Sequence, residues 1–160
     1  MPSLAIRPAV IDDVALLHKL ICELADYERL RHTVAATEDD LRAALFGPKP
    51  CCEALIGSVD GDELGFALYF QNYSTFVGRP GLYLEDLYVR PAARGIGLGK
   101  ALLQRIAAIA VERRCGRVEW TALDWNAPAI NFYEKLGAKQ MTNWRLFRLS
   151  GEELERFGAS

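Results

Sequence analysis

The chain has 160 residues, of which 51% are hydrophobic and 25% are charged. This length suits one domain, and this composition is typical of a globular protein rather than a disordered or fibrous one. The formal net charge of −2, with no local run of Lys or Arg, gives no electrostatic basis for binding nucleic acid, so we expect no such partner.

The first third of the chain predicts one strand and two helices. Residues 4–10 have the pattern of a short strand. Apolar residues recur at helical spacing over residues 12–30, whose first two residues are aspartates that can cap a helix. Thr37–Asp40 resembles a capping box, and the helix that it opens stops at Gly47–Pro48.

Three strands and a helix are predicted next. Residues 52–59 and 63–70 form two apolar runs around Asp60-Gly61-Asp62, which is a hairpin signal. A third strand covers residues 82–89, and a helix over residues 98–113 has its apolar residues on one face.

The last third predicts a strand, a helix and another strand. Residues 117–123 have a strand pattern, and Asn126 precedes a helix with a proline in its first turn and a glycine at its end. Residues 138–149 predict a final strand before a terminal helical turn. The order β-α-α-β-β-β-α-β-α-β predicts a single α/β domain over residues 1–160, with a mixed central sheet flanked by helices.

Cysteine spacing and hydropathy exclude further classes. The four cysteines form no CxxC pair and have no histidine at metal-binding spacing, so we expect reduced side chains and no metal site. The N-terminus lacks the pattern of a signal peptide, and no stretch approaches the roughly eighteen apolar residues of a membrane span. We therefore expect a cytoplasmic protein without a membrane partner.

A glycine-rich loop lies between the strand at 82–89 and the helix that follows. Gly95, Gly97 and Gly99 leave backbone N–H groups uncovered at a helix N-terminus, where the dipole is positive. Pyrophosphate is the ligand that this arrangement suits best, and Arg94 and Lys100 can add positive charge. A tight turn that merely needs glycine is the alternative interpretation.

Two common phosphate loops do not fit this spacing. A Walker A loop needs glycine where the chain has Arg94 and a hydroxyl residue where it has Ala101. A dinucleotide-binding G-x-G-x-x-G needs glycine at Lys100 or Leu102.

The order of the motifs carries a resemblance to a known family. Arg94-x-x-Gly97-x-Gly99, after a strand and at the start of a helix, resembles the acyl-CoA loop of the GNAT acetyltransferases. The motifs "YLED", "RGIGLG", "DWNAPAINFYEKLGA" and "WRLF" follow one another as in the spermidine/spermine and thialysine acetyltransferases of that family. "IRPA", "ELADYE" and residues 37–47 extend the match to the N-terminus. The resemblance implies the GNAT fold, acetyl-CoA as cosubstrate, an amine substrate and a homodimer.

Transfer of an acetyl group to an amine needs a proton acceptor. A primary amine with a pKa near 10 is mostly charged at pH 7, so exposing its lone pair costs about 4 kcal/mol. Neighbouring strand residues point to opposite faces, so we expect Glu85 and Asp86 not to share a proton; two exposed strand acids are the alternative. The resemblance implies that Glu85 takes the proton of the amine, directly or through water, and that Asp86 helps to hold the cation.

The departing thiolate needs stabilisation as well. Tyr133 lies seven residues after Asn126, at nearly the same angle round the predicted helix, and an ordinary core tyrosine is the alternative interpretation. In the resembled enzymes the matching tyrosine acts as general acid at the sulfur of acetyl-CoA. Because the pKa of tyrosine, about 10, is no lower than that of a thiol, we expect hydrogen bonding to the thiolate to be most of its role.

The resemblance also implies which residues contact the two substrates. Backbone groups from Leu87 to Val89 would pair with the pantetheine arm like an added strand. The predicted cofactor contacts are Leu87, Tyr88, Val89, Arg94, Gly95, Ile96, Gly97, Leu98, Gly99, Lys100, Glu119, Trp120, Thr121, Asn126, Ala127, Pro128, Ala129 and Tyr133. The predicted amine contacts are Tyr27, Glu28, Glu85, Asp86 and Trp144. For the strand at 119–121 and the helix start at 126–129, core packing and capping are the alternative interpretations.

The chain departs from the polyamine enzymes at two places. After Tyr27 and Glu28 it carries Arg31 and His32 where those enzymes are acidic, and before Trp144 it lacks a short acidic insertion. Each positive charge of a polyamine needs a carboxylate nearby, so these departures weaken the polyamine assignment more than the acetyltransferase assignment. "LDWN" and "KLGA" resemble the thialysine type more closely, which favours a diamine or a lysine-like amine.

Two other functions stay open at this point. An enzyme that acetylates a protein lysine or N-terminus would use a wide groove instead of an acid-lined pocket. A CoA-binding module without catalysis would lose the acid and base positions, whereas Glu85 and Tyr133 are both present.

Overall fold

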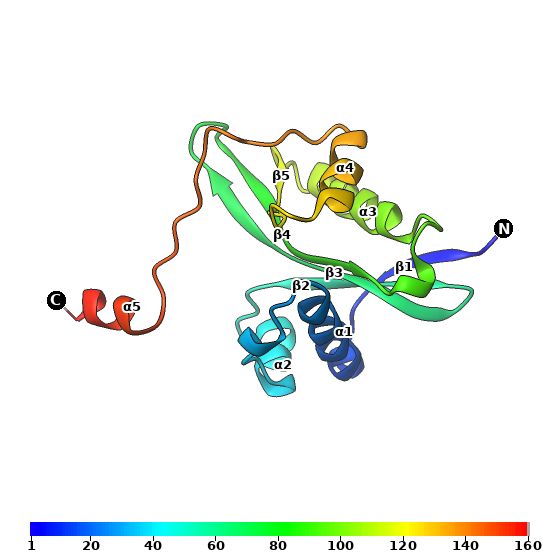
Figure 1. Cartoon of the computed structure of the whole chain (residues 1–160), viewed down its shortest axis with the longest axis horizontal. Helices are drawn as coiled ribbons and strands as arrows, with labels where there is room; N and C mark the ends of the chain where they lie inside the picture. Colours follow the sequence, from blue (N-terminus) through cyan, green and yellow to red (C-terminus); the bar gives the residue numbers. More distant parts are fainter. Residues whose placement is uncertain (160) are drawn as a thin grey trace. The chain divides into compact units, whose positions relative to one another are not determined.

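A computed structural model of the chain describes residues 1–159. They fall into two compact units, and the chain passes from one to the other between Thr121 and Ala122. The first unit contains a five-stranded sheet and three helices (Figure 1). Its elements are β1 (Leu4–Pro8), α1 (Val14–Tyr27), α2 (Glu38–Phe46), β2 (Glu53–Val59), β3 (Asp62–Ser74), β4 (Arg79–Val89), α3 (Leu98–Glu112) and β5 (Val118–Glu119). The second unit contains α4 (Ala127–Lys135) and α5 (Gly151–Gly158).

The sheet has the order β1-β2-β3-β4-β5 and is mixed, as predicted. Strands β1 to β4 pair antiparallel, and β5 runs parallel to β4. The β2–β3 hairpin turns at Asp60 and Gly61, whose positive φ values of 52° and 92° suit a tight two-residue turn.

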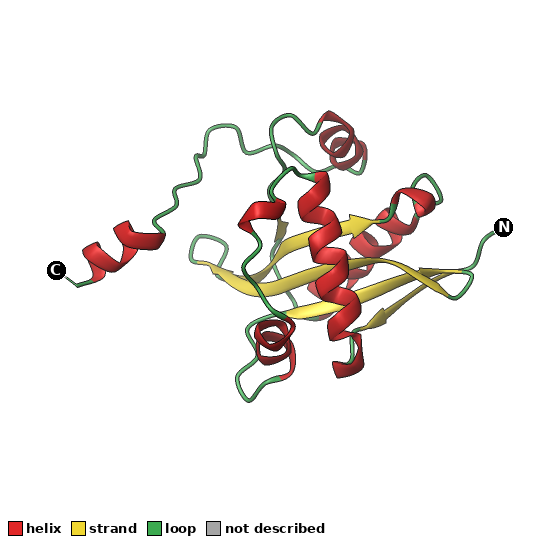
Figure 2. Ribbon diagram, turned by 60° about the horizontal axis from the view of Figure 1, so that its bottom comes forward, coloured by secondary structure: helices red, strands yellow, loops and turns green. Residues whose placement is uncertain are grey.

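Helices cover both faces of the sheet. Helices α1 and α2 lie on one face and α3 on the other, and Figure 2 brings the α1–α2 face toward the viewer. The α1–α2 face buries a core cluster of Val14, Leu17, Leu20, Leu41, Leu45, Ala54, Ile56, Phe66 and Tyr88. The α3 face buries Leu98, Leu102 and Ile106, and a side chain at Gly57 would clash with Leu98. This packing fixes both the end of α1 and the start of α3 against β4.

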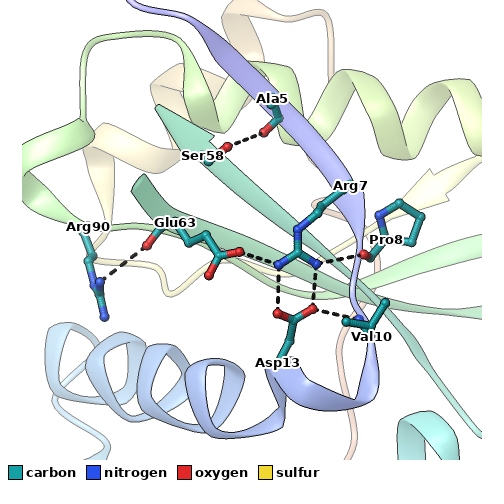
Figure 3. Close-up of polar contacts among 8 residues, drawn as sticks. All are labelled: Ala5, Arg7, Pro8, Val10, Asp13, Ser58, Glu63 and Arg90. Carbon is teal, nitrogen blue, oxygen red and sulfur yellow. Dashed lines mark hydrogen bonds and ion pairs between the residues drawn. The ribbon is translucent and has the colours of Figure 1, made fainter. Parts of the chain in front are cut away.

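Ion pairs join the start of α1 to the strands beneath it (Figure 3). The Arg7 guanidinium donates to both oxygens of Asp13 at 2.7 and 2.8 Å and also to Glu63. Arg90, directly after β4, donates to both oxygens of Glu23 in α1 at 3.0 and 2.9 Å. Paired guanidinium–carboxylate bonds of this kind fix orientation as well as proximity.

Near the C-terminus one predicted strand is shorter than expected and another is absent from the described residues. β5 spans only Val118–Glu119 because its pairing with β4 covers two residues. Residues 138–149 form no strand, and Figure 2 draws this segment as loop between α4 and α5. The segment has the apolar residues of a strand, but a strand also needs a neighbour for its backbone groups, and none of residues 1–159 pairs with it. No helix within residues 1–159 combines the length and the apolar character that crossing a bilayer requires.

Candidate functional site

The two adjacent acids lie at a β-bulge in β4. Where β3 pairs with β4, Leu68 opposes Asp86 and Tyr69 opposes Leu84, so Glu85 is the extra residue. A bulge interrupts the alternation of side chains and bends the strand. We expected Glu85 and Asp86 to point to opposite faces because side chains alternate along a strand. The bulge interrupts that alternation at this position. After burial, the charge of Glu85 is the next cause that raises the pKa of Asp86.

A third acid reaches this position from α1. Glu28 is the C-cap residue of that helix. Burial, and then the charges of Glu85 and Glu28, raise the pKa of Asp86 to about 7. Partial burial raises the pKa of Glu28 too, whereas Glu85 is exposed. In these three residues, the carboxylate cluster, burial and then mutual repulsion favour the protonated form of Asp86, so a bound cation would be favoured.

The glycine-rich loop begins at Gly95, six residues after the last residue of β4. Gly95 and Gly97 have φ values of +78° and +102°, and Gly97 is the N-cap of α3. A Cβ at Gly95 would meet no atom within 4 Å, so packing does not explain the glycine there. Backbone conformation does, because residues with a side chain rarely adopt positive φ. The loop leaves open backbone at a helix N-terminus, which is suited to a phosphate group.

The side chains of the loop differ in exposure. Leu98, the first residue of α3, is fully buried, whereas Ile96 and Lys100 are exposed. Leu98 therefore anchors the helix and has only its backbone to offer a ligand.

Within residues 1–159, strand pairing along one edge of β4 stops before the loop. On the side that faces β5, pairing covers Leu82 and Tyr83, and β4 continues to Val89. The predicted contact segment Leu87–Val89 lies in that continuation. A strand edge of this kind can take up an extended ligand through backbone hydrogen bonds. The side chain of Tyr88 is buried in the core cluster, so at that position too only the backbone can contribute.

Arg94 links the loop to both β4 and α1. Its Nε donates to the carbonyl oxygen of Val89 at 2.9 Å. Its guanidinium carbon lies 4.8 Å from the ring centroid of Tyr27 and 5.7 Å from that of Tyr88. Both distances are within the range of a cation–π interaction.

The structure brings together the predicted residues of the first unit along β4. Tyr27 and Glu28 end α1, the acids follow at the bulge, and the loop follows the strand. Glu119 pairs with Arg117 at 3.0 Å at the end of β5, and Trp120 and Thr121 continue the chain from there.

The second unit contains the remaining predicted residues. Asn126 caps α4 as predicted, since its side chain accepts a hydrogen bond from the Ala129 N–H at 3.4 Å. Ala127 and Pro128 form the first turn of that helix. Tyr133 is half-buried on the same helix with its ring centroid 5.4 Å from that of Phe132. Trp144 is exposed in the loop that replaces the predicted strand.

Cys52 is a neighbour of the site that the sequence pattern did not reveal. It lies just before β2 and packs partly against the core cluster. Burial is the first cause that raises the pKa of its thiol to about 11, and the charge of Asp86 contributes. The sheet register would have revealed this neighbour, because Ala54 opposes Leu68 and Leu68 opposes Asp86. Sequence alone does not give that register.

A hollow of about 240 Å³ lies elsewhere, lined in part by Glu53, Tyr69 and Arg113. None of the predicted site residues lines it, and Arg113 already donates to both oxygens of Glu53 at 2.7 Å. We place the site at β4, where the uncompensated acids and the open loop backbone lie. Within residues 1–159 no group of three or more His, Cys, Asp or Glu has the arrangement to hold a metal ion.

Comparison with known proteins gives consistent matches. The acetyltransferase (GNAT) family matches residues 16–138. The chain is 38% identical to thialysine N-epsilon-acetyltransferase of Bos taurus, over 96% of each chain. It is 34% identical to L-ornithine N5-acetyltransferase of Arabidopsis thaliana, over 94% of this chain and 86% of the other. An integron cassette protein from the mobile metagenome of V. cholerae superposes with a TM-score of 0.82 at 29% identity, covering 99% of both chains.

Proposed function

The chain belongs to the GNAT acetyltransferase family and is an acyltransferase, and from that premise we propose that it transfers the acetyl group of acetyl-CoA to a primary amine of a small molecule. The amine belongs to the diamine and polyamine or the thialysine and lysine-like type. The observation that carries the proposal is the position of the carboxylate cluster on the strand that leads into the glycine-rich loop.

The loop and the end of β4 fit acetyl-CoA. The open backbone at Gly95 and the N-terminus of α3 suit the pyrophosphate, and Arg94 adds positive charge. The edge at Leu87–Val89, which extends beyond the pairing with β5, suits the pantetheine arm, and the Val89 carbonyl oxygen there accepts from Arg94. Asp86 and Val89 are three residues apart on an extended strand, about 10 Å. An arm bound along that edge would carry the thioester toward the acids.

The carboxylate cluster suits the amine. An ammonium group would offset the repulsion among Glu28, Glu85 and Asp86 and would lower the pKa of Asp86 from about 7. Glu85 takes the proton of the incoming amine, directly or through water, and Asp86 helps to hold the cation. Asp86 is a second candidate for proton acceptor because a pKa near neutral pH suits a general base.

The chemical step needs no covalent enzyme intermediate. The amine nitrogen attacks the thioester carbonyl carbon, the new C–N bond forms, and the C–S bond breaks. The amine proton passes to Glu85, and Tyr133 donates a hydrogen bond or its proton to the departing sulfur. Direct attack in a ternary complex follows from placing both substrates along one strand.

The amine is small and carries few charges. Two relatives are named for thialysine and for L-ornithine, each an amino acid with a side-chain amine. Arg31 comes three residues after Glu28 of the carboxylate cluster, and its positive charge disfavours a long polycation there.

We propose a homodimer as well. Large exposed apolar side chains gather in the segment after α4, namely Trp144, Leu146, Phe147, Leu149, Leu154 and Phe157. Contact with a second copy would remove this apolar surface from water. Light scattering should give twice the chain mass for wild type and a lower mass for Phe147→Glu. Phe76→Glu, at an exposed phenylalanine of the β3–β4 turn, should stay dimeric. A monomeric wild type would contradict this proposal.

Thiol release from acetyl-CoA tests the function. We expect turnover with thialysine, lysine, ornithine or putrescine, each with a product heavier by one acetyl group. Faster turnover of a lysine-bearing peptide than of every free amine would indicate a protein acetyltransferase. CoA binding without turnover of any amine would indicate a binding module.

A further inference from the structure

The end of α1 contacts the cofactor loop as well as the predicted amine site. Tyr27 is the last residue of α1, next to Glu28 of the carboxylate cluster. Its ring nonetheless lies against the guanidinium of Arg94, at 4.8 Å from the centroid to the guanidinium carbon. A residue expected to bind the amine thus contacts the arginine that precedes the glycine-rich loop.

Arg94 is held from three directions. Its Nε donates to the Val89 carbonyl oxygen, which ties the side chain back to the end of β4. Tyr88 lies 5.7 Å from it and is fixed by burial in the core cluster. Tyr27, with 38% of its surface exposed, is the third contact. The guanidinium keeps its two terminal nitrogens for an anion, because within residues 1–159 neither has a hydrogen-bond or ion-pair partner.

We infer that Tyr27 is a positioning residue for acetyl-CoA, acting through Arg94. By contacting the guanidinium together with Tyr88, Tyr27 fixes the direction in which its remaining N–H groups face the phosphates. This rests on the proposed use of acetyl-CoA. It makes α1 a part of both substrate sites, with Glu28 serving the amine and Tyr27 the cofactor.

The test is calorimetric titration of CoA into the full chain without any amine. Tyr27→Leu should weaken CoA binding by about three- to thirtyfold, as expected for loss of one cation–π contact. Tyr27→Phe keeps the ring and should bind CoA within about twofold of wild type. Tyr73→Leu removes an exposed tyrosine of β3 far along the strand and should leave binding unchanged. Equal melting temperatures would show that the variants are folded.

A double-mutant cycle tests whether Tyr27 acts through Arg94. In an Arg94→Met background, Tyr27→Leu should change CoA binding by less than about twofold. Independent effects of the two substitutions would overturn the inference. So would unchanged CoA binding by Tyr27→Leu together with a raised KM for the amine, which would make Tyr27 an amine residue only. A wild type that binds no CoA would remove the proposed function and this inference together, whereas failure of Tyr27→Leu alone leaves the proposed function standing.

Discussion

Along the C-terminal half of β4 the site has two ends: at the bulge three carboxylates approach one another, and beyond Val89 a glycine-rich loop leads into α3. The acids lie together because α1 ends beside a bulge in the strand. The loop has its shape because Gly95 and Gly97 adopt positive φ at the start of α3. One site depends on charge and burial, and the other on backbone geometry. A substitution at either end should therefore affect one substrate and spare the other.

The largest expected effect is at the amine end. Glu85→Gln should lower kcat by about a thousandfold, because it removes the proposed proton acceptor while keeping its shape. The KM for acetyl-CoA should stay within about twofold, since the cofactor end is untouched. Glu112→Gln, at an exposed acid that pairs with Arg105 on α3, is the matched control. A kcat within about threefold of wild type would remove Glu85 from the mechanism, and a larger loss in Asp86→Asn would transfer the role to Asp86.

Tyr133→Phe should lower kcat by about a hundredfold and leave both KM values nearly unchanged. The substitution keeps the packing against Phe132 and removes only the hydroxyl that would stabilise the thiolate. Steady-state kinetics with a thiol reagent measure this. If Tyr133→Phe and Glu85→Gln both turn over like wild type, the assigned chemistry is wrong at both positions.

The charge at the amine end should also appear in the stability of the fold. The pKa of Asp86 is raised to about 7 in the folded chain, so between pH 4 and 7 the folded state binds more protons than the unfolded state. This contribution to stability is largest at low pH and is lost as the pH rises. From pH 5 to 7 the wild type should lose about 2 kcal/mol relative to Asp86→Asn, roughly thirtyfold in the unfolding equilibrium. Urea unfolding at each pH measures the difference, and a constant difference would mean that Asp86 titrates normally.

The smallest effect is expected at the cofactor end. Gly95→Val should raise the KM for acetyl-CoA by about tenfold, because a side chain strains the positive φ of the loop and covers its amides. Gly61→Val is the matched control, with a positive φ and open space around it, but in the β2–β3 turn. Both variants should lose similar stability, and only Gly95→Val should affect the cofactor. Equal KM values for the two would assign the glycine to folding alone.

Local patterns were sufficient to predict most elements and the glycine-rich turn at the start of α3. The capping box at Thr37, the hairpin turn at Gly61 and the strand–glycine–helix order at Gly95–Gly99 each depend on a few consecutive residues. The backbone preferences of those residues operate wherever the segment lies.

Features that depend on distant partners could not be predicted in this way. The bulge at Glu85 arises from the register of β4 with β3, and the effect of Glu28 on Asp86 depends on α1 packing near that strand. The stacking of Tyr27 on Arg94 joins residues far apart in sequence. The predicted strand at residues 138–149 also failed for want of a partner. Its apolar residues match a strand, but a segment joins a sheet only by pairing with a neighbouring strand.

Calorimetric titration of CoA into wild type, Gly95→Val and the double variant Glu85→Gln/Asp86→Asn, without amine, tests the separation of the two ends most directly. We expect the double variant to bind CoA within about twofold of wild type although its turnover is lost, and Gly95→Val to bind at least about tenfold more weakly. Loss of CoA binding in the double variant, or full binding by Gly95→Val, would contradict separate amine and cofactor sites, one at the bulge of β4 and one in the loop that follows the strand.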